Sequence, residues 1–150
     1  MAVVTFSHRP LVILALGAML GCQHPIVLPS PSAPAETGNQ FLSAVNANDR
    51  NAMALLFGDE RGPSSVVRTN SETVRMQQMT ILQRLLRGDS HEVVSTDVST
   101  PARPKLTVTI VQGTRRFTVP FTMAQSRAGG WLVQAIDVTP AMPTAGSQPR

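Results

Sequence analysis

Tyrosine is absent from this chain of 150 residues, and cysteine and tryptophan occur only once each. The single cysteine, Cys22, excludes an internal disulfide and any zinc site that is built from several cysteines. The sequence also lacks a glycine-rich phosphate loop, a His-Glu-x-x-His motif and a nucleophile elbow. We therefore expect no cofactor and no metal, and a domain that is held together by its apolar core alone.

Lysine is scarce as well, because Lys105 is the only one and every other basic residue is arginine. The chain has 13 basic and 9 acidic residues, so its charge is nearly balanced. Nucleic-acid binding needs a clustered basic patch, usually with aromatic side chains that stack on bases. The closest pattern, Arg115 and Arg116 beside Phe117, is more typical of a strand that passes from solvent to core. We therefore expect no nucleic-acid partner.

The most specific stretch is residues 11–22, LVILALGAMLGC. A short apolar run that follows a basic segment and ends in a small residue is the pattern of a secretory signal. The run is far shorter than the ~20 residues that an α-helix needs to cross a bilayer. Residues 19–22 resemble the lipobox of bacterial lipoproteins, whose cysteine receives acyl chains such as palmitate and becomes the new N-terminus. The resemblance implies a signal peptide at 1–21 and a lipidated Cys22; a soluble secreted protein and an uncleaved anchor are the alternatives.

Proline-rich segments flank the expected domain, which we place at residues 40–138. Residues 22–39, with the cysteine at their start, form a linker whose composition favours extended polyproline II over a packed fold. Residues 139–150 have a similar composition and predict a disordered tail. In Gram-negative lipoproteins the residue after the cysteine influences sorting, and Gln23 resembles the outer-membrane case. We expect the protein in the cell envelope, anchored to a membrane.

Apolar residues at helical spacing predict helices in the first half of the domain. Residues 41–57 read as two helices, or as one helix with a pronounced break. Asp49 is a good N-cap for the second of these, and Gly58 is a good stop. Residues 64–68 are expected to form a short strand.

The most regular predicted helix comes next. Thr69 and Glu72 have capping-box spacing at its start, with Ser71 as a rival cap, and Gly88 ends it. Its expected apolar stripe consists of Val74, Met79, Ile81, Leu82, Leu85 and Leu86.

After the helices the apolar period changes to two, which predicts β-strands. The predicted strands cover residues 91–98, 105–111, 115–123 and 131–138. Pro120 lacks a ladder donor and so predicts an edge position or a bulge. The last strand is apolar on both faces, so we expect it at the centre of an antiparallel sheet.

Helices followed by antiparallel strands predict an α+β domain, with N-terminal helices packed against a curved antiparallel sheet of about four strands. FLSAVNANDRNAMALLFG, the long helix and GGWLVQAIDV resemble the NTF2-like (cystatin-like α+β roll) superfamily, and in particular envelope lipoproteins with such domains. In that fold the sheet wraps around a long helix and leaves a cavity that serves small apolar ligands, catalysis or dimerisation. The resemblance implies a possible pocket lined by Met79, Phe117, Phe121 and Trp131.

Glu92, Asp97, Asp137 and His91 are the remaining candidates for acid–base chemistry. Asp97 can instead form a cross-strand ion pair with an arginine at 115 or 116. Asp137 fits a turn or cap, and His91 is expected in solvent. The catalytic relatives use tyrosine, aspartate and histidine directed into the cavity, so we assign no catalytic residue.

The leading hypothesis is a membrane-anchored, non-catalytic module that binds a small apolar ligand or a protein partner. A small hydrolase or isomerase that uses aspartate and histidine is the second hypothesis. A self-associating structural module, such as a homodimer, is the third. An apolar cavity favours binding, a buried aspartate beside His91 favours catalysis, and an exposed apolar sheet face favours dimerisation.

Overall fold

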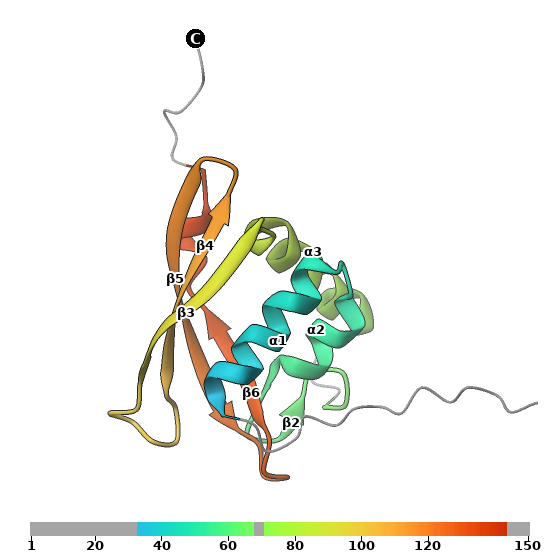
Figure 1. Ribbon diagram of the computed structural model, residues 1–150. Coiled ribbons are helices and arrows are strands. Elements are labelled where there is room, and N and C mark those ends of the chain that lie inside the picture. Colours follow the sequence, from blue (N-terminus) through green and yellow to red (C-terminus); the bar gives the residue numbers. More distant parts are fainter. Residues whose placement is uncertain (1–32, 68–70, 144–150) are drawn as a thin grey trace, which may run out of the picture.

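The computed structural model describes residues 33–67 and 71–143 (Figure 1). They form an α+β domain with helices in the first half and the main strands in the second, as the sequence predicts. The expected signal and Cys22 lie outside the described residues. The elements are α1 (Pro34–Asn46), α2 (Arg50–Leu56), β1 (Gly58–Asp59), β2 (Gly62–Pro63), α3 (Glu72–Leu86), β3 (Ser90–Asp97), β4 (Lys105–Gln112), β5 (Arg115–Gln125), β6 (Trp131–Ile136) and the short 3₁₀ helix η1 (Thr139–Ala141).

Strands β3 to β6 form one antiparallel sheet in chain order. Alternation along β4 directs Leu106, Val108 and Ile110 to the inner face, where each is fully buried. Helix α1 lies along this face, and the twisted sheet partly wraps around it (Figure 1). Helices α2 and α3 pack against α1 and against each other.

Aromatic rings fix α1 on the sheet. Phe41 of α1 meets Phe121 of β5 edge-on, with ring centroids 6.1 Å apart, and Phe57 lies 6.3 Å from Phe41 on another side. A Cβ added to Gly38 would lie only 2.7 Å from Leu106 Cδ1. The missing side chain therefore lets the start of α1 approach the start of β4 closely.

Helix α1 begins at Pro34, so the predicted boundary at residue 40 was placed too late. Proline is favoured in the first turn of a helix, because its missing N–H has no intrahelical partner there in any case. Thr37, inside the expected linker, is fully buried. Pro34 therefore starts a helix and does not belong to the linker.

The break between α1 and α2 is confirmed, as is the cap at Asp49. Its Oδ1 accepts the Ala52 N–H at 2.9 Å. At the start of α3 the rival cap is the one used, since Ser71 Oγ accepts the Val74 N–H at 3.3 Å. Thr69 lies outside the described residues.

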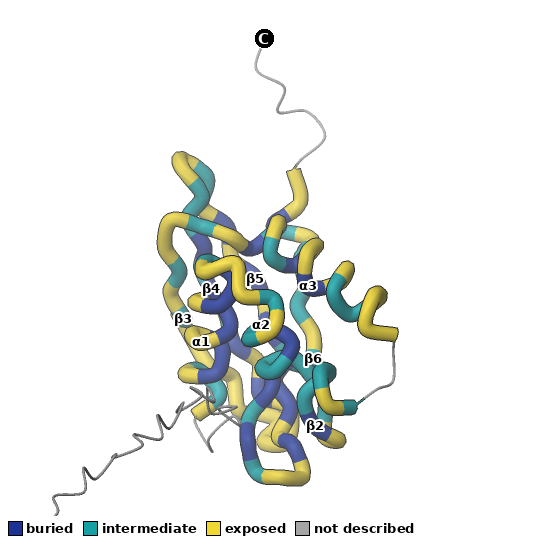
Figure 2. The backbone as a smooth tube through the Cα atoms, turned by 90° about the vertical axis from the view of Figure 1, so that its right-hand side faces the viewer, coloured by how far each residue is buried: buried dark blue, intermediate teal, exposed yellow. Residues whose placement is uncertain are grey.

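The predicted apolar stripe of α3 is only partly correct. Met79, Leu82 and Leu86 are buried, but Val74 is 51% exposed and Ile81 is 52% exposed. Helix α3 packs on α1 and α2 at the margin of the domain, and Figure 2 shows most of it as intermediate or exposed. Only a narrow stripe is needed there, so the second apolar row is left facing solvent.

The prediction that the last strand is central is wrong. Strand β6 forms an edge of the sheet, and β4 and β5 occupy its middle. Cover for β6 comes from the first half of the chain instead. Phe57 forms a parallel bridge with Val133, and β1 packs beside β6. Residues 57–59 thus cover part of the outer edge of β6.

Pro120 lies in the inner strand β5, so the predicted edge position is wrong. Its carbonyl oxygen accepts the Asp137 N–H at 3.0 Å, one residue beyond the end of β6. The N–H and C=O of one strand residue point to the same side, so the donor that proline lacks faces a place where the ladder has already ended. A register shift follows between Thr122 and Met123.

Residues 64–67, expected to begin a strand, form a turn instead. Ser64 Oγ and the Ser65 N–H donate to the carbonyl oxygen of Ala54 at 3.0 and 3.3 Å. These bonds satisfy a carbonyl in the last turn of α2, which otherwise has no helical partner. The turn is thereby fixed against the end of α2.

The predicted tail also begins later than residue 139, because η1 packs against β5 and Ala141 is buried. The Arg115 guanidinium donates to the carbonyl oxygens of Pro140 and Met142 at 2.8 Å and of Ala141 at 3.0 Å. It also lies 4.8 Å from the centre of the Phe117 ring. We call this arrangement the C-terminal clamp.

The clamp lies by the β4–β5 hairpin, whereas α1 begins at the opposite end of the sheet (Figure 1). The chain thus enters and leaves the domain at opposite ends. No helix in the described part of the chain is long and apolar enough to cross a bilayer.

Candidate functional site

Asp97 and Asp137 each close a turn. Asp97 Oδ1 accepts the Ser99 N–H at 2.9 Å, and Asp137 Oδ1 accepts the Thr139 N–H at 3.0 Å. The backbone and side-chain hydrogen bonds from Ser99 hold the pKa of Asp97 below its usual 3.8, and those from Thr139 do the same for the pKa of Asp137. Both carboxylates are exposed and are weakened as bases, so the turn role predicted for Asp137 is confirmed.

The predicted ion pair of Asp97 is wrong. Asp97 lies opposite Lys105 on β4, and that lysine also lowers the carboxyl pKa, after the larger effect of the Ser99 hydrogen bonds. Arg115 and Arg116 pair with the far end of β4. The antiparallel register, which the sequence does not show, decides which charges can meet across the sheet.

The acid–base candidates are dispersed. His91 and Asp97 are six residues apart on β3, which separates them by ~20 Å. Asp137 follows β6, three strands away from β3, or ~14 Å. Glu92 is exposed, and half-buried His91 has its pKa lowered below 6.5 by burial. No two of these groups are positioned to share one substrate atom.

The four side chains expected to line a pocket belong to the packed interior. Met79 and Phe121 have no exposed surface, and Phe117 is 8% exposed. Trp131 is partly buried and packs on the same core cluster. The hollows described next are lined by other residues.

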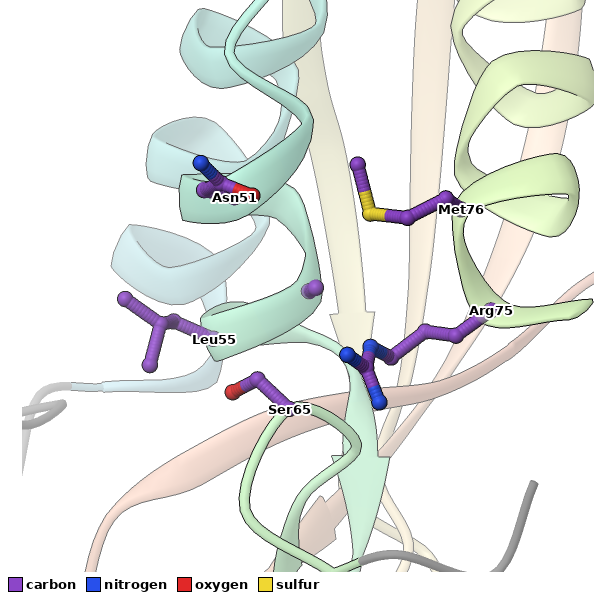
Figure 3. A pocket seen from close by; sticks show the side chains of 6 residues that line it. Asn51, Leu55, Ser65, Arg75 and Met76 are labelled. Carbon is purple, nitrogen blue, oxygen red and sulfur yellow. The ribbon is translucent and has the colours of Figure 1, made fainter. Parts of the chain in front are cut away.

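A hollow of about 230 Å³ opens between α2, α3 and the turn at residues 64–67. Figure 3 shows Met76 and Arg75 extending from α3 towards α2 and the turn. Apolar and polar side chains both contribute to this surface, which we call the interhelical hollow. Its lining residues are Asn51, Ala54, Leu55, Ser65, Arg75 and Met76.

Arg75 is poorly satisfied within the protein. Its Nη1 donates to the Ser64 carbonyl oxygen at 3.4 Å, which is longer than the ~2.9 Å of an ordinary N–H···O bond. Its Nε is buried and has no hydrogen-bond partner in the protein. Neither of the two ion pairs found among residues 33–67 and 71–143 involves this arginine. A half-buried guanidinium therefore faces the hollow without a carboxylate.

Ser65 adds a second polar group. Its backbone N–H is used by Ala54, as described above, but its Oγ is buried without a hydrogen-bond partner in the protein. Buried hydroxyl and guanidinium groups normally have partners, because an unpaired one costs about 1–3 kcal/mol. Two residues that line this hollow therefore each have a buried polar atom without a partner in the protein.

A second hollow, of about 340 Å³, lies among loops at the end of the sheet where β4 begins. Glu60 and Arg127 line it, and the Arg127 N–H donates to the Glu60 carbonyl oxygen at 2.9 Å. Arg103 holds the Glu60 carboxylate at 3.1 Å. We call it the loop hollow. Because the Glu60 carboxylate is already paired with Arg103, this hollow offers a ligand fewer free polar groups than the interhelical hollow.

Sequence reasoning missed the interhelical hollow. It placed Ser65 in a predicted strand, and Arg75 was not among the side chains expected to line a pocket. The hollow is assembled from three segments whose packing the sequence does not encode locally. The one usable signal was Arg75 itself, four residues before buried Met79 and therefore on the same helical face.

No group of three or more His, Cys, Asp or Glu side chains in the described ranges could hold a metal ion. Comparison with known proteins found no matching family model, no similar curated protein and no similar solved structure. Any functional proposal therefore depends on the geometry of this chain and on its sequence.

Proposed function

We propose that this chain is a lipid-anchored envelope protein whose domain binds a ligand or partner without catalysing a reaction. The anchor rests on the lipobox-like residues 19–22, with a signal peptide at 1–21 and acyl chains on Cys22. Gln23 favours the outer membrane if the cell is Gram-negative. We further propose that the domain is an NTF2-like roll, an assignment supported by helices that precede a four-stranded antiparallel sheet wrapped around α1.

The location of the unsatisfied polar groups is the observation that favours binding over catalysis. Acid–base catalysis needs groups that reach one substrate, but His91, Asp97 and Asp137 are far apart. Recognition needs a few convergent polar groups in an otherwise apolar hollow. Ser65 and Arg75 line one hollow with apolar neighbours, which fits recognition better.

Detergent-phase partitioning tests the anchor. Two or more acyl chains hold a protein on a membrane, at about 0.8 kcal/mol for each buried CH₂. The wild-type chain should therefore enter the detergent phase and resist salt washing, and Cys22→Ser should do neither. Ser32→Ala, in the same linker, is the matched control and should behave like wild type. Retention of Cys22→Ser in the detergent phase would refute the lipid anchor.

Crosslinking of the lipidated protein in its own membrane, followed by mass spectrometry, tests the binding role. We expect a crosslinked partner or a co-purified small molecule. Finding neither, in crosslinking and in native-state mass spectrometry, would contradict the proposal.

Self-association is a second candidate, because Val74 and Ile81 are seven residues apart and form an exposed apolar row on α3. A size measurement over a range of concentrations decides it. A constant monomer size would remove this candidate, whereas a dimer that Ile81→Asp dissociates would support it.

A further inference from the structure

The interhelical hollow contains a cationic group that the fold itself does not use. The Arg75 guanidinium reaches from α3 to the turn at residues 64–67, and its one hydrogen bond within the described residues is the long bond to the Ser64 carbonyl oxygen. Two donors without a partner in the protein, the buried Arg75 Nε and Ser65 hydroxyl, thus belong to residues that line one hollow.

The chemistry of the donors selects the ligand's head group. A guanidinium presents Nε and Nη as a planar fork that matches the two oxygens of a carboxylate. A single guanidinium and one hydroxyl suit a monoanion better than a phosphate, which carries more charge and three acceptor oxygens. Arg75 also lies in the first turns of α3, where the helix dipole favours negative charge.

The walls select the rest of the ligand. Ala54, Leu55 and Met76 give the hollow an apolar lining, and methionine adapts readily to different shapes. A volume of about 230 Å³ lies below the ~300–1,000 Å³ of pockets for drug-sized molecules. The space suits a small ligand with a short apolar body.

We propose that the interhelical hollow binds a short apolar carboxylate, with Arg75 as the fork that holds the carboxylate and Ser65 as a second donor. Ala54, Leu55 and Met76 contact the apolar body. This site deepens the binding role proposed above and rests on it, by naming the ligand class.

The test is a titration of the full chain, purified in a non-ionic detergent with isotope-labelled arginine, and followed by the NMR signals of the arginine Nε–H groups. Hexanoate is the probe, hexanol is its uncharged counterpart, and inorganic phosphate is an anion without an apolar body. We expect hexanoate to shift the Arg75 signal in a saturable way, while hexanol and phosphate leave it in place.

Variants assign the contacts. Arg75→Gln should weaken hexanoate binding roughly tenfold or more, as for loss of a charged hydrogen bond, and Ser65→Ala about fivefold. Arg75→Lys keeps the charge without the fork and should also bind more weakly. Arg84→Gln is the matched control, because Arg84 is an exposed arginine on the same helix outside the hollow, and it should bind like wild type.

Several results would overturn the site. These are no shift with hexanoate, an equal shift with hexanol or phosphate, or unchanged affinity in both Ser65→Ala and Arg75→Lys. If Arg75→Gln fails to fold, the wild-type titration and Ser65→Ala still decide. If crosslinking finds a partner but hexanoate does not shift the Arg75 signal, this site is refuted and the proposed binding role remains.

Discussion

Arg115 and Arg75 are both half-buried arginines, yet the two regions around them differ sharply. In the C-terminal clamp, Arg115 donates to three carbonyl oxygens and covers the ring of Phe117. In the interhelical hollow, Arg75 makes one long hydrogen bond and keeps a buried Nε without a partner in the protein.

This contrast separates a region whose contacts stabilise the domain from the region where we propose that a ligand binds. On the inner face of the sheet, the apolar side chains of β4 and β5 are buried, and Arg115 at one end of the sheet is fully paired by the clamp. Beside α3, Arg75 Nε and Ser65 Oγ lack partners in the protein, and an apolar row is exposed. Sites that bind ligands are commonly less stable than they could be, because their groups are arranged for something outside the fold.

Phe121→Ala should have the largest effect on the sheet side. Phe121 is fully buried and packs edge-on with Phe41, so its loss should lower the free energy of unfolding by about 3–5 kcal/mol. Chemical denaturation measures the change. Thr118→Ala, on the outer face of the same strand, should change stability by less than ~0.5 kcal/mol. Similar losses in the two variants would show that the inner face does not dominate stability.

Arg115→Gln should have the next largest effect. It removes charged hydrogen bonds to three carbonyl oxygens, and after allowance for partial exposure we expect a loss of about 1–2 kcal/mol. Denaturation measures this loss, and limited proteolysis should show cleavage near residues 139–143. Arg116→Gln, an exposed neighbour, is the control and should stay close to wild type. An intact, protected C-terminal segment in Arg115→Gln would mean that the clamp is not what holds it.

Arg75→Met should have a smaller effect of the opposite sign. Replacing an unpaired, half-buried guanidinium by an apolar side chain of similar length removes an unmet hydrogen-bonding demand, so stability should stay level or rise by up to ~1 kcal/mol. Thermal denaturation of this variant beside Arg84→Met, which should be neutral, measures it. A clear destabilisation specific to Arg75→Met would show that the arginine is structural and would erase the contrast with Arg115.

His91 should give the smallest effect, visible as a pH dependence. Burial lowers its pKa in the folded state below 6.5, so the unfolded chain takes up the proton first as the pH falls. The contribution of His91 to stability is therefore complete above pH 6.5 and declines below it, and His91→Gln should remove this part of the decline. His24→Gln, outside the domain, should keep the decline. A wild-type curve that is flat over this range would contradict the assignment.

Much of the fold could be predicted from local patterns. The alternation of Leu106, Val108 and Ile110 gave a strand with one buried face, and Asp49 marked the start of α2. Both signals depend on near neighbours in sequence. By contrast, the edge position of β6 and the exposure of Ile81 depend on which distant segment provides cover, and no local period reports that.

The candidate site could hardly be predicted at all. Asp97 and His91 were candidates for acid–base catalysis because of their residue types, but they lie far apart along β3. Ser65 and Arg75 came together only when the turn after α2 met the face of α3. Unpaired polar atoms become visible only once every partner has been counted in three dimensions.

The opposite exits of the chain have a consequence for how an anchored domain would be oriented. The first turns of α1 lie beside Leu106, and the clamp lies beside Arg115, which pairs with Gln112 at the other end of β4, ~20 Å away. If acyl chains on Cys22 hold the protein, the anchored linker joins the domain at the end of the sheet where the loop hollow lies. The β4–β5 hairpin would then be the outward-facing tip, and residues 139–143, which the clamp holds, would lie on the side of the domain that points away from the bilayer.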